Sequence, residues 1–172
     1  MKVSVIIPSL NPDNKLVAVV DALLEEGFKD IIIVNDGSDE EHMAPFNEVA
    51  AHSECTILTH EVNKGKGRGL KTAFEFCLEN RKDIDGVVTV DGDNQHRAKD
   101  IKKCSETMVS TGNVVLGVRD FTGDDVPARS KFGNNMTSGV FKVLCRLNIS
   151  DTQTGFCLLY TSDAADDLIG VD

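Results

Sequence analysis

The chain of 172 residues lacks an excess of basic side chains. Its 18 Lys and Arg residues are outnumbered by 28 Asp and Glu residues, which leaves a formal net charge of −10 at pH 7. Proteins that bind nucleic acid through its phosphates carry clustered positive charge. The composition therefore argues against a nucleic-acid partner, while the length is sufficient for one domain, or part of one, with a core of its own.

Two further patterns are missing. The five cysteines are scattered and form no Cys-x-x-Cys pair, which argues against a disulfide framework or a zinc site. No apolar run approaches the roughly 18 residues of a membrane-spanning helix. The first apolar run, at residues 3–7, is strand-length and ends at Pro8, unlike a signal peptide. We therefore expect a soluble, cytoplasmic chain with reduced thiols.

Strand and helix patterns alternate along the sequence. Short apolar runs rich in β-branched residues predict strands, and apolar residues spaced three and four apart predict helices. Strands are expected at residues 3–7, 31–35, 56–60, 87–90 and 114–117. Helices are expected at residues 14–26, 40–52, 68–79, 99–110 and 128–147. Continuous apolar strands between amphipathic helices predict an α/β fold, with a mostly parallel sheet and helices on both faces.

The last expected helix, residues 128–147, has two interpretations. Its apolar face is typical of packing in a core. Its basic residues would also suit a helix that rests on a membrane surface: Arg129, Lys131, Lys142 and Arg146.

Polar residues follow three of the expected strands, at residues 9–11, 36–38 and 91–93. Ligands of open parallel sheets bind outside the carboxyl ends of the strands, so these clusters predict one site. Asp91 and Asp93, separated by a single glycine, offer the hard oxygen ligands that Mg²⁺ or Mn²⁺ prefers. Such an ion can hold a diphosphate and make a nucleoside diphosphate a competent leaving group.

Five motifs in the same order resemble glycosyltransferase family 2, the nucleotide-sugar enzymes of the GT-A fold. They are Val-Ser-Val-Ile-Ile-Pro at 3–8, Val-Asn-Asp-Gly-Ser at 34–38, Asn-Lys-Gly-Lys-Gly at 63–67, Asp-Gly-Asp-Asn-Gln-His at 91–96 and Asp-Thr-Gln-Thr-Gly-Phe at 151–156. The fourth and fifth resemble the branch that transfers sugars to polyprenyl phosphates such as dolichyl and bactoprenyl phosphate.

The resemblance implies a GT-A nucleotide-diphospho-sugar transferase domain in residues 1–156. It also implies inverting, metal-dependent transfer with Mg²⁺ or Mn²⁺, from a UDP- or GDP-linked sugar to a polyprenyl phosphate at the membrane surface. The parent protein would then work at the cytoplasmic face of the membrane.

The resemblance assigns roles to individual residues. Those expected at the nucleotide are Pro8, Asn11, Asp36, Lys66 and Asp91. Those expected at the metal are Asp91, Asp93 and Gln95, and the catalytic set is Asp91, Asp93 and Asp151. Arg119 and Arg129 match positions that hold the acceptor phosphate, where a planar guanidinium suits two parallel hydrogen bonds.

Some of these roles have alternatives. Asp36 would read the base of the nucleotide or, as a turn residue, cap the next helix. His96 would be a further ligand or a helix cap, and the two arginines would otherwise form surface salt bridges. The remaining histidines are interpreted as surface or packing residues: His42, His52 and His60.

The nature of the acceptor decides whether a base is needed. A sugar hydroxyl must lose a proton as it attacks, which calls for a general base. A phosphate monoester is already an anion at neutral pH. Asp151 is the candidate base if the acceptor is a hydroxyl.

Residues 157–172 depart from the family pattern. Their sequence, Cys-Leu-Leu-Tyr-Thr-Ser-Asp-Ala-Ala-Asp-Asp and onward, resembles the translation of a transposon-end sequencing adaptor. We expect a non-native tail that supplies no strand or helix, after a domain that is incomplete at its C-terminal side. A divergent natural terminus is the alternative.

Two other functions are weighed against glycosyl transfer. A sugar nucleotidyltransferase would share the sheet but carries a Gly-rich, basic loop after its first strand, which residues 9–12 do not provide. A truncated fragment would bind nucleotide sugar without catalysis.

Overall fold

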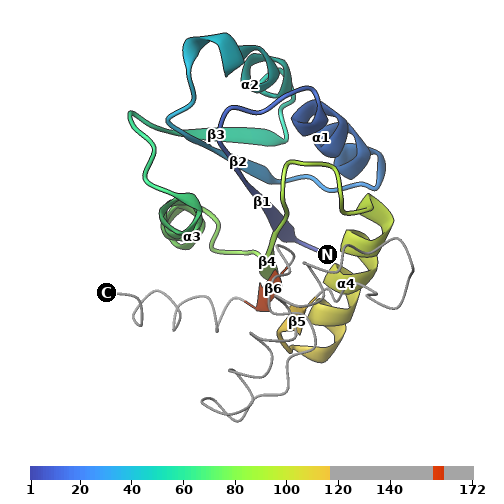
Figure 1. Ribbon diagram of the computed structural model, residues 1–172. Helices are drawn as coiled ribbons and strands as arrows, with labels where there is room; N and C mark the ends of the chain where they lie inside the picture. The colour runs from blue at the N-terminus through green and yellow to red at the C-terminus, as the bar shows by residue number, and fades with distance from the viewer. Residues whose placement is uncertain (117–156, 161–172) are drawn as a thin grey trace, which may run out of the picture. The chain divides into compact units, whose positions relative to one another are not determined.

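The computed structural model describes residues 1–116 and 157–160 (Figure 1). Several predictions lie outside these residues: the helix at 128–147 and the site residues Arg119, Arg129 and Asp151. Among the helices that the structure does describe, none has both the length and the apolar character needed to cross a bilayer.

A six-stranded sheet runs through the described part in the order β3-β2-β1-β4-β6-β5. Its strands are β1 (Val3–Ser9), β2 (Ile31–Asp36), β3 (Cys55–His60), β4 (Gly86–Thr89), β5 (Val115–Leu116) and β6 (Cys157–Tyr160). β1 pairs in parallel with both β2 and β4, and β2 pairs in parallel with β3. β6 is antiparallel to β4. The predicted α/β class with a mostly parallel sheet is therefore confirmed.

Helices cover both faces of this sheet (Figure 1). They are α1 (Lys15–Glu25), a 3₁₀ turn η1 (Glu40–His42), α2 (Met43–Val49), α3 (Lys66–Asn80) and α4 (Ala98–Thr111). The core on one face joins the sheet to α1, α2 and α4, and the core on the other face joins it to α3. This arrangement confirms the expectation of helices on both faces.

The apolar run of β2 shows why both faces must be covered. Successive side chains of a strand point to opposite faces. Ile31 and Ile33 therefore enter the core with α1, α2 and α4, whereas Ile32 and Val34 enter the core with α3. All four are fully buried. A continuous apolar strand of this kind is stable only between two layers of helices.

The first strand is longer than predicted. Pro8 was expected to end it, yet β1 continues through Pro8, opposite Val34, to Ser9. The N–H of Val5 points toward β2, and N–H directions alternate along a strand, so the backbone nitrogen of Pro8 points toward β4. The pairing of β1 with β4 ends at Ile6, so no ladder hydrogen bond is required there. A proline lacks the N–H of a ladder and is tolerated where no partner needs it.

Two other expectations are corrected. The helix predicted at 40–52 is a 3₁₀ turn followed by α2, which ends at Val49. No strand was expected in 157–172, but Cys157–Tyr160 forms β6 beside β4, because an apolar four-residue segment can satisfy the open backbone edge of that strand. The proposed origin of residues 157–172 in a sequencing adaptor stays a prediction.

The three described cysteines are free thiols: Cys55, Cys77 and Cys104. Burial raises the pKa of both Cys55 and Cys77 to about 11. Both side chains are therefore neutral thiols at physiological pH and act as small apolar core residues.

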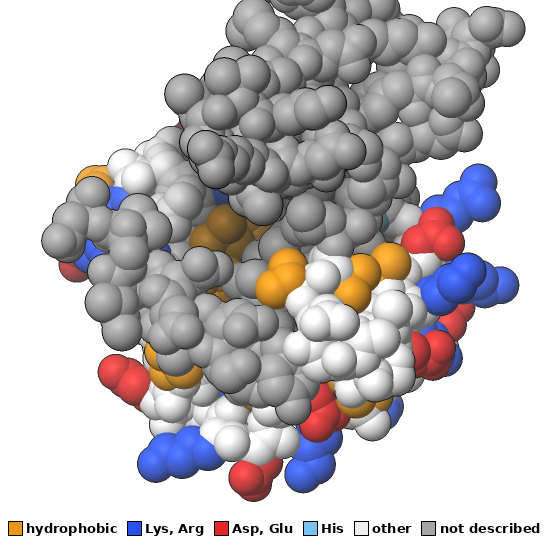
Figure 2. All heavy atoms as spheres, turned by 90° about the horizontal axis from the view of Figure 1, so that it is seen from below, with side chains coloured by type: hydrophobic (Ala, Val, Ile, Leu, Met, Phe, Trp, Pro, Cys, Tyr) orange, Lys and Arg blue, Asp and Glu red, His pale blue; other side chains and the backbone are white. Residues whose placement is uncertain are grey.

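Charged side chains of both signs are interspersed around the rim of the described part on the face shown in Figure 2. Ion pairs also join different elements of the structure, as between Lys102 of α4 and Glu26 at the end of α1, at 3.4 Å. Exposed pairs of this kind contribute little to stability, roughly 0–1 kcal/mol each.

Candidate functional site

The polar clusters predicted at the strand ends lie at the carboxyl edge of the sheet. The segments after β1, β2, β3 and β4 all leave from this edge, because these four strands are parallel. The loop at 61–65 leads from β3 into α3, so the N-terminus of α3 also faces the edge. The candidate site is thus built by loops that are 20 to 30 residues apart in sequence.

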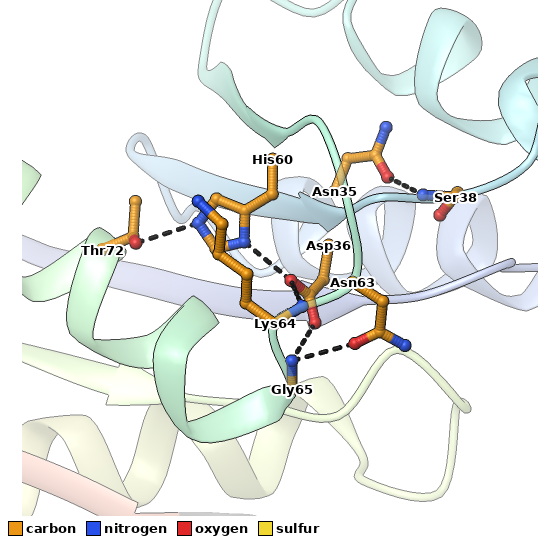
Figure 3. Close-up of polar contacts among 8 residues, drawn as sticks. All are labelled: Asn35, Asp36, Ser38, His60, Asn63, Lys64, Gly65 and Thr72. Carbon is orange, nitrogen blue, oxygen red and sulfur yellow. Dashed lines mark hydrogen bonds and ion pairs between the residues drawn. The ribbon is translucent and has the colours of Figure 1, made fainter.

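A buried pair of side chains joins the ends of β2 and β3 (Figure 3). Asp36 and His60 are the last residues of their strands and lie opposite each other in the parallel register. The Nδ1 atom of His60 is 2.6 Å from Oδ1 of Asp36, and Nε2 is 3.0 Å from Oγ1 of Thr72 in α3. Only 4% of Asp36 and 7% of His60 is exposed, so the pair is shielded from solvent.

Asp36 also holds the loop at 61–65. The backbone N–H of Lys64 donates to its Oδ1 at 3.0 Å, and the N–H of Gly65 donates to its Oδ2 at 2.8 Å. Gly65 is the N-cap residue of α3. Asp36 therefore anchors the segment that enters α3, although it bonds none of the first-turn N–H groups that a helix cap satisfies. The next helical elements in the sequence, η1 and α2, have no side-chain cap, so the alternative role expected for Asp36 is wrong. The negative charge of Asp36 is well placed against the positive end of the α3 dipole.

The environment of Asp36 shifts its pKa. Burial alone would raise the pKa of this carboxyl group. The hydrogen bonds from His60, Lys64 and Gly65, together with the charge of His60, outweigh burial and hold the pKa below its ordinary value of 3.8. Asp36 is therefore ionised at neutral pH.

A second ion pair spans the candidate site. Lys66 is the first residue of α3, and its Nζ atom lies 2.5 Å from Oδ1 of Asp91, just beyond β4. The side chains of Lys66 and Asp91 are 52% and 30% exposed, so both are accessible to a ligand. The structure thus brings together two residues that the resemblance assigned to the nucleotide.

The loops after β1 and β2 are clasped together by Asn11. Its backbone N–H donates to Oγ of Ser38, its Nδ2 donates to Oδ2 of Asp39, and its Oδ1 accepts from the N–H of Asp39, all at 2.9 Å. Asn11 adopts a φ of 47°, which asparagine tolerates better than most residues. Its side-chain amide, predicted to contact the nucleotide, is thus engaged in joining the two loops.

The loop with Asp91 and Asp93 approaches the end of β1. A Cβ on Gly92 would lie 3.2 Å from Oγ of Ser9, which is buried and has no hydrogen-bond partner among the described residues. Oδ1 of Asp93 accepts the backbone N–H of Gln95 at 3.1 Å. A cavity of about 260 Å³ opens here, and its walls include Pro8, Ser9, Asn11, Asp13, Lys15, Gly92 and Asp93.

The donors at the end of β4 suit a divalent cation chemically. Asp91, Asp93 and Gln95 carry carboxylate and amide oxygens, which Mg²⁺ and Mn²⁺ prefer. In the structure the ammonium group of Lys66 pairs with Asp91. A bound divalent cation would take the place of that ammonium group at the carboxylate. Among the described residues, Asp91 and Asp93 are not part of a cluster of three His, Cys or acidic residues whose ligand atoms lie within 4.8 Å of one another. In the described part of the chain, such a cluster is formed by Asp39, Glu41 and His42.

Sequence reasoning missed the role of His60. It was interpreted as a surface or packing residue, and it is indeed buried, but both ring nitrogens are bonded. The available signal was its position. His60 is the last residue of the strand predicted at 56–60, and Asp36 directly follows the strand predicted at 31–35, so both were expected at the carboxyl edge of the sheet. His42 and His52 are partly exposed, with 34% and 38% of their side chains accessible.

The turn after β2 depends on Gly37. Asn35 shapes the turn by accepting the N–H of Ser38 on its Oδ1 at 2.9 Å (Figure 3). Gly37 has a φ of +75°, and a Cβ there would overlap the backbone of Val62 and Asn63. The loop at 61–65 thus packs directly on the turn, at a position that only glycine fits.

We expect Gly37→Ala to lower the free energy of unfolding by roughly 2–4 kcal/mol, since it adds overpacking to the cost of a positive φ. Gly27→Ala is the matched control, because Gly27 also has a positive φ, +91°, but no atom within 4 Å of its Cβ position. That variant should lose only about 1 kcal/mol. Urea denaturation measures both values, and equal losses would contradict close packing of the loop on Gly37.

The lowered pKa of Asp36 predicts a pH dependence. A carboxyl group with a pKa lower in the folded than in the unfolded state stabilises the fold above about pH 4, and this contribution is lost as pH falls through the folded pKa. Asp36→Asn should therefore cost about 3 kcal/mol at pH 7. Its deficit relative to the unsubstituted protein should shrink between pH 5 and pH 3. Denaturation curves at each pH test this, and a deficit that stays constant would refute it.

Comparison with known proteins extends these observations. The family model of glycosyl transferase family 2 matches residues 4–169. An uncharacterized protein of Methanocaldococcus jannaschii is 25% identical over 98% of this chain and 68% of its own length. A UDP-N-acetylglucosamine–dolichyl-phosphate N-acetylglucosaminyltransferase of Methanococcus voltae is 27% identical over 87% of this chain and 66% of its own. The chain therefore spans about two thirds of these relatives.

Solved structures share the fold. Glucosyl-3-phosphoglycerate synthase of Mycobacterium tuberculosis, in complex with Mn²⁺, UDP and glucosyl-3-phosphoglycerate, has a TM-score of 0.68 at 16% identity, over 94% of this chain and 57% of that one. TarS 1–349 of S. aureus, in complex with UDP-GlcNAc, has a TM-score of 0.65 at 18% identity, over 97% and 47%. Because the family model covers nearly the whole chain, the protein belongs to glycosyltransferase family 2, a family of enzymes.

Proposed function

We propose that residues 1–156 form the donor-binding part of an inverting, metal-dependent glycosyltransferase. It would transfer a sugar from a nucleotide-diphosphate sugar to a polyprenyl phosphate. The observation that carries the proposal is the placement of Lys66 against Asp91, at the carboxyl edge of the sheet and beside the N-terminus of α3. This edge is where parallel α/β sheets bind their ligands.

The charges of this edge suit a diphosphate. Lys64, Lys66 and Arg68 are all exposed and lie in the loop before α3 or in its first turn. The first turn of a helix also presents backbone N–H groups without intrahelical acceptors, which favours bound phosphate. Lys66 is currently paired with Asp91 and would be shared with the phosphates in the complex. The Mycobacterium tuberculosis structure contains UDP, and the TarS structure contains UDP-GlcNAc, on the same fold.

Asp91, Asp93 and Gln95 would hold Mg²⁺ or Mn²⁺. When bound, such an ion neutralises the negative charge that develops on the leaving diphosphate. Asp91 and Asp93 orient the diphosphate end of the donor, and Asp36 and Asn11 hold the loops that border it. Pro8 packs beside Gly69 of α3, where a Cβ on the glycine would lie 3.8 Å from Cβ of Pro8. Both residues would thereby form the floor of the nucleotide pocket.

A polyprenyl phosphate is the acceptor we favour. The Methanococcus voltae relative is named for transfer to dolichyl phosphate. Arg119 and Arg129 are proposed to hold the acceptor phosphate, and Asp151 is the base that a hydroxyl acceptor would require. An anionic phosphate acceptor needs positioning more than deprotonation. The parent enzyme would then act at the cytoplasmic face of the membrane.

We expect the double variant Asp91→Asn/Asp93→Asn to lose at least about tenfold in affinity for UDP in Mn²⁺ buffer, about 1.4 kcal/mol. Titration calorimetry with UDP and GDP, with Mn²⁺ and with EDTA, measures this. In EDTA the same variant should bind no more weakly than the unsubstituted protein, because Lys66 is released from its carboxylate partner.

The control is Glu79→Gln/Asp83→Asn, which changes the net charge equally at exposed positions near the opposite end of α3. Its UDP affinity should stay unchanged. Equal affinities of the site variant and the control in Mn²⁺ would refute the proposed donor site. Tight UDP binding without release of UDP from UDP-sugars would instead support a binding fragment without catalysis.

Asp151→Asn is expected to separate the two classes of acceptor. Transfer to a polyprenyl phosphate should continue at a similar rate, since the phosphate is already anionic. Transfer to a sugar hydroxyl should be lost, by a factor of about 10²–10⁴ for a missing general base. Radiolabelled sugar transfer to each acceptor measures both rates, and an equal loss in the two assays would contradict this assignment.

A further inference from the structure

His60 connects three segments that are distant in sequence. Its ring lies at the end of β3, next to Asp36 of β2 and Thr72 of α3 (Figure 3). An ionised carboxylate can only accept, so Nδ1 of His60 carries a proton and donates it to Asp36. The Nε2 atom is the hydrogen-bond partner of the Thr72 hydroxyl, which can donate or accept. Both ring nitrogens are used, and the side chain is almost fully buried.

The contacts continue from Asp36 to the proposed donor site. Asp36 accepts the backbone N–H groups of Lys64 and Gly65, and Gly65 begins α3. The next residue, Lys66, places its ammonium group on Asp91. Hydrogen bonds and the covalent link from Gly65 to Lys66 therefore connect the buried ring of His60 to the ion pair.

The loop at 61–65 depends on these polar contacts, because it buries no side chain of its own. All five of its residues are exposed, and Val62 is 62% exposed. Its backbone rests on Gly37, two of its N–H groups donate to Asp36, and the carbonyl of Gly65 accepts the N–H of Gly69 in α3. A carboxylate that lost its buried partner would be free to turn toward solvent, since an unpaired buried charge is costly.

We propose that His60 is a positioning residue for the donor site. By donating to Asp36, it fixes the carboxylate in the orientation that anchors the loop at 61–65, and thereby places Lys66 for contact with a diphosphate. The inference relies on the proposed function for the identity of the ligand, a nucleoside diphosphate. The control of the loop at 61–65 by His60 does not depend on the proposed function.

Two variants of His60 separate the bond to Asp36 from the bond to Thr72. Asparagine has a short side chain whose amide can donate from near the position of Nδ1, so His60→Asn keeps a donor for Asp36. Glutamine is longer and places its amide near the position of Nε2, so His60→Gln keeps a partner for Thr72 and loses the donor to Asp36. Both variants remove the ring from the core and should lose similar packing energy.

The experiment uses the full 172-residue chain. We expect His60→Gln to weaken UDP binding in Mn²⁺ buffer about tenfold, the effect of losing one hydrogen bond to a charged group. His60→Asn should stay within about threefold of the unsubstituted protein. Hydrogen exchange followed by NMR should show the amides of Lys64 and Gly65 exchanging about tenfold faster in His60→Gln than in His60→Asn.

Thr72→Val is the control for general destabilisation, because it removes the other bond of His60 and leaves the bond to Asp36. Thr72→Val should lower the melting temperature. Its loss of UDP affinity should be smaller than that of His60→Gln. Equal UDP affinity of His60→Gln and the unsubstituted protein would overturn the proposal. So would an equal loss in Thr72→Val, or unchanged exchange of the Lys64 and Gly65 amides in His60→Gln.

The failure of the proposed function has a different signature. If the unsubstituted protein bound neither UDP nor GDP with Mn²⁺, the donor-site assignment would fail. The amide exchange of the His60 variants would then decide alone whether His60 controls the loop.

Discussion

The buried carboxylate of Asp36 is the constraint on which the candidate site depends. It ends one strand, binds the histidine that ends the neighbouring strand, and accepts two backbone N–H groups at the start of α3. A charge in this position would be costly if it were unpaired, because only 4% of Asp36 is exposed to solvent. Its hydrogen bonds offset that cost and leave it ionised. Strand ends, loop and helix are thereby held in one arrangement.

Around this buried anion the edge is assembled from contacts of different kinds. Asn11 joins the loops after β1 and β2 by three hydrogen bonds. Gly37 allows one backbone segment to lie directly on another. The pair of Lys66 and Asp91 is partly exposed and could exchange one partner for a ligand. The interior of the edge is therefore joined by buried hydrogen bonds, whereas its surface carries a charged pair that a ligand can reach.

Membership of glycosyltransferase family 2 agrees with this arrangement. The fold is shared with solved structures that contain UDP or a UDP-sugar, at identities of 16% and 18%. At such low sequence identity the fold is retained while individual side chains differ, because packing tolerates substitutions that preserve volume and pattern. Function must then be argued from the site. The relation of Asp36 to His60 is an example of a feature that must be read from this chain itself.

The sequence by itself determined the class of fold and the edge of the sheet where the site lies. Apolar runs such as residues 31–34 are local signals of strands buried on both faces, and the polar residues that follow them mark the carboxyl ends. Only the tertiary structure decided the partners of Asp36, which lie 24 to 29 residues away, and the extension of β1 through Pro8. The reason is physical: periodicity is a property of neighbouring residues, whereas strand register and the path of a loop over Gly37 are set by packing between distant segments.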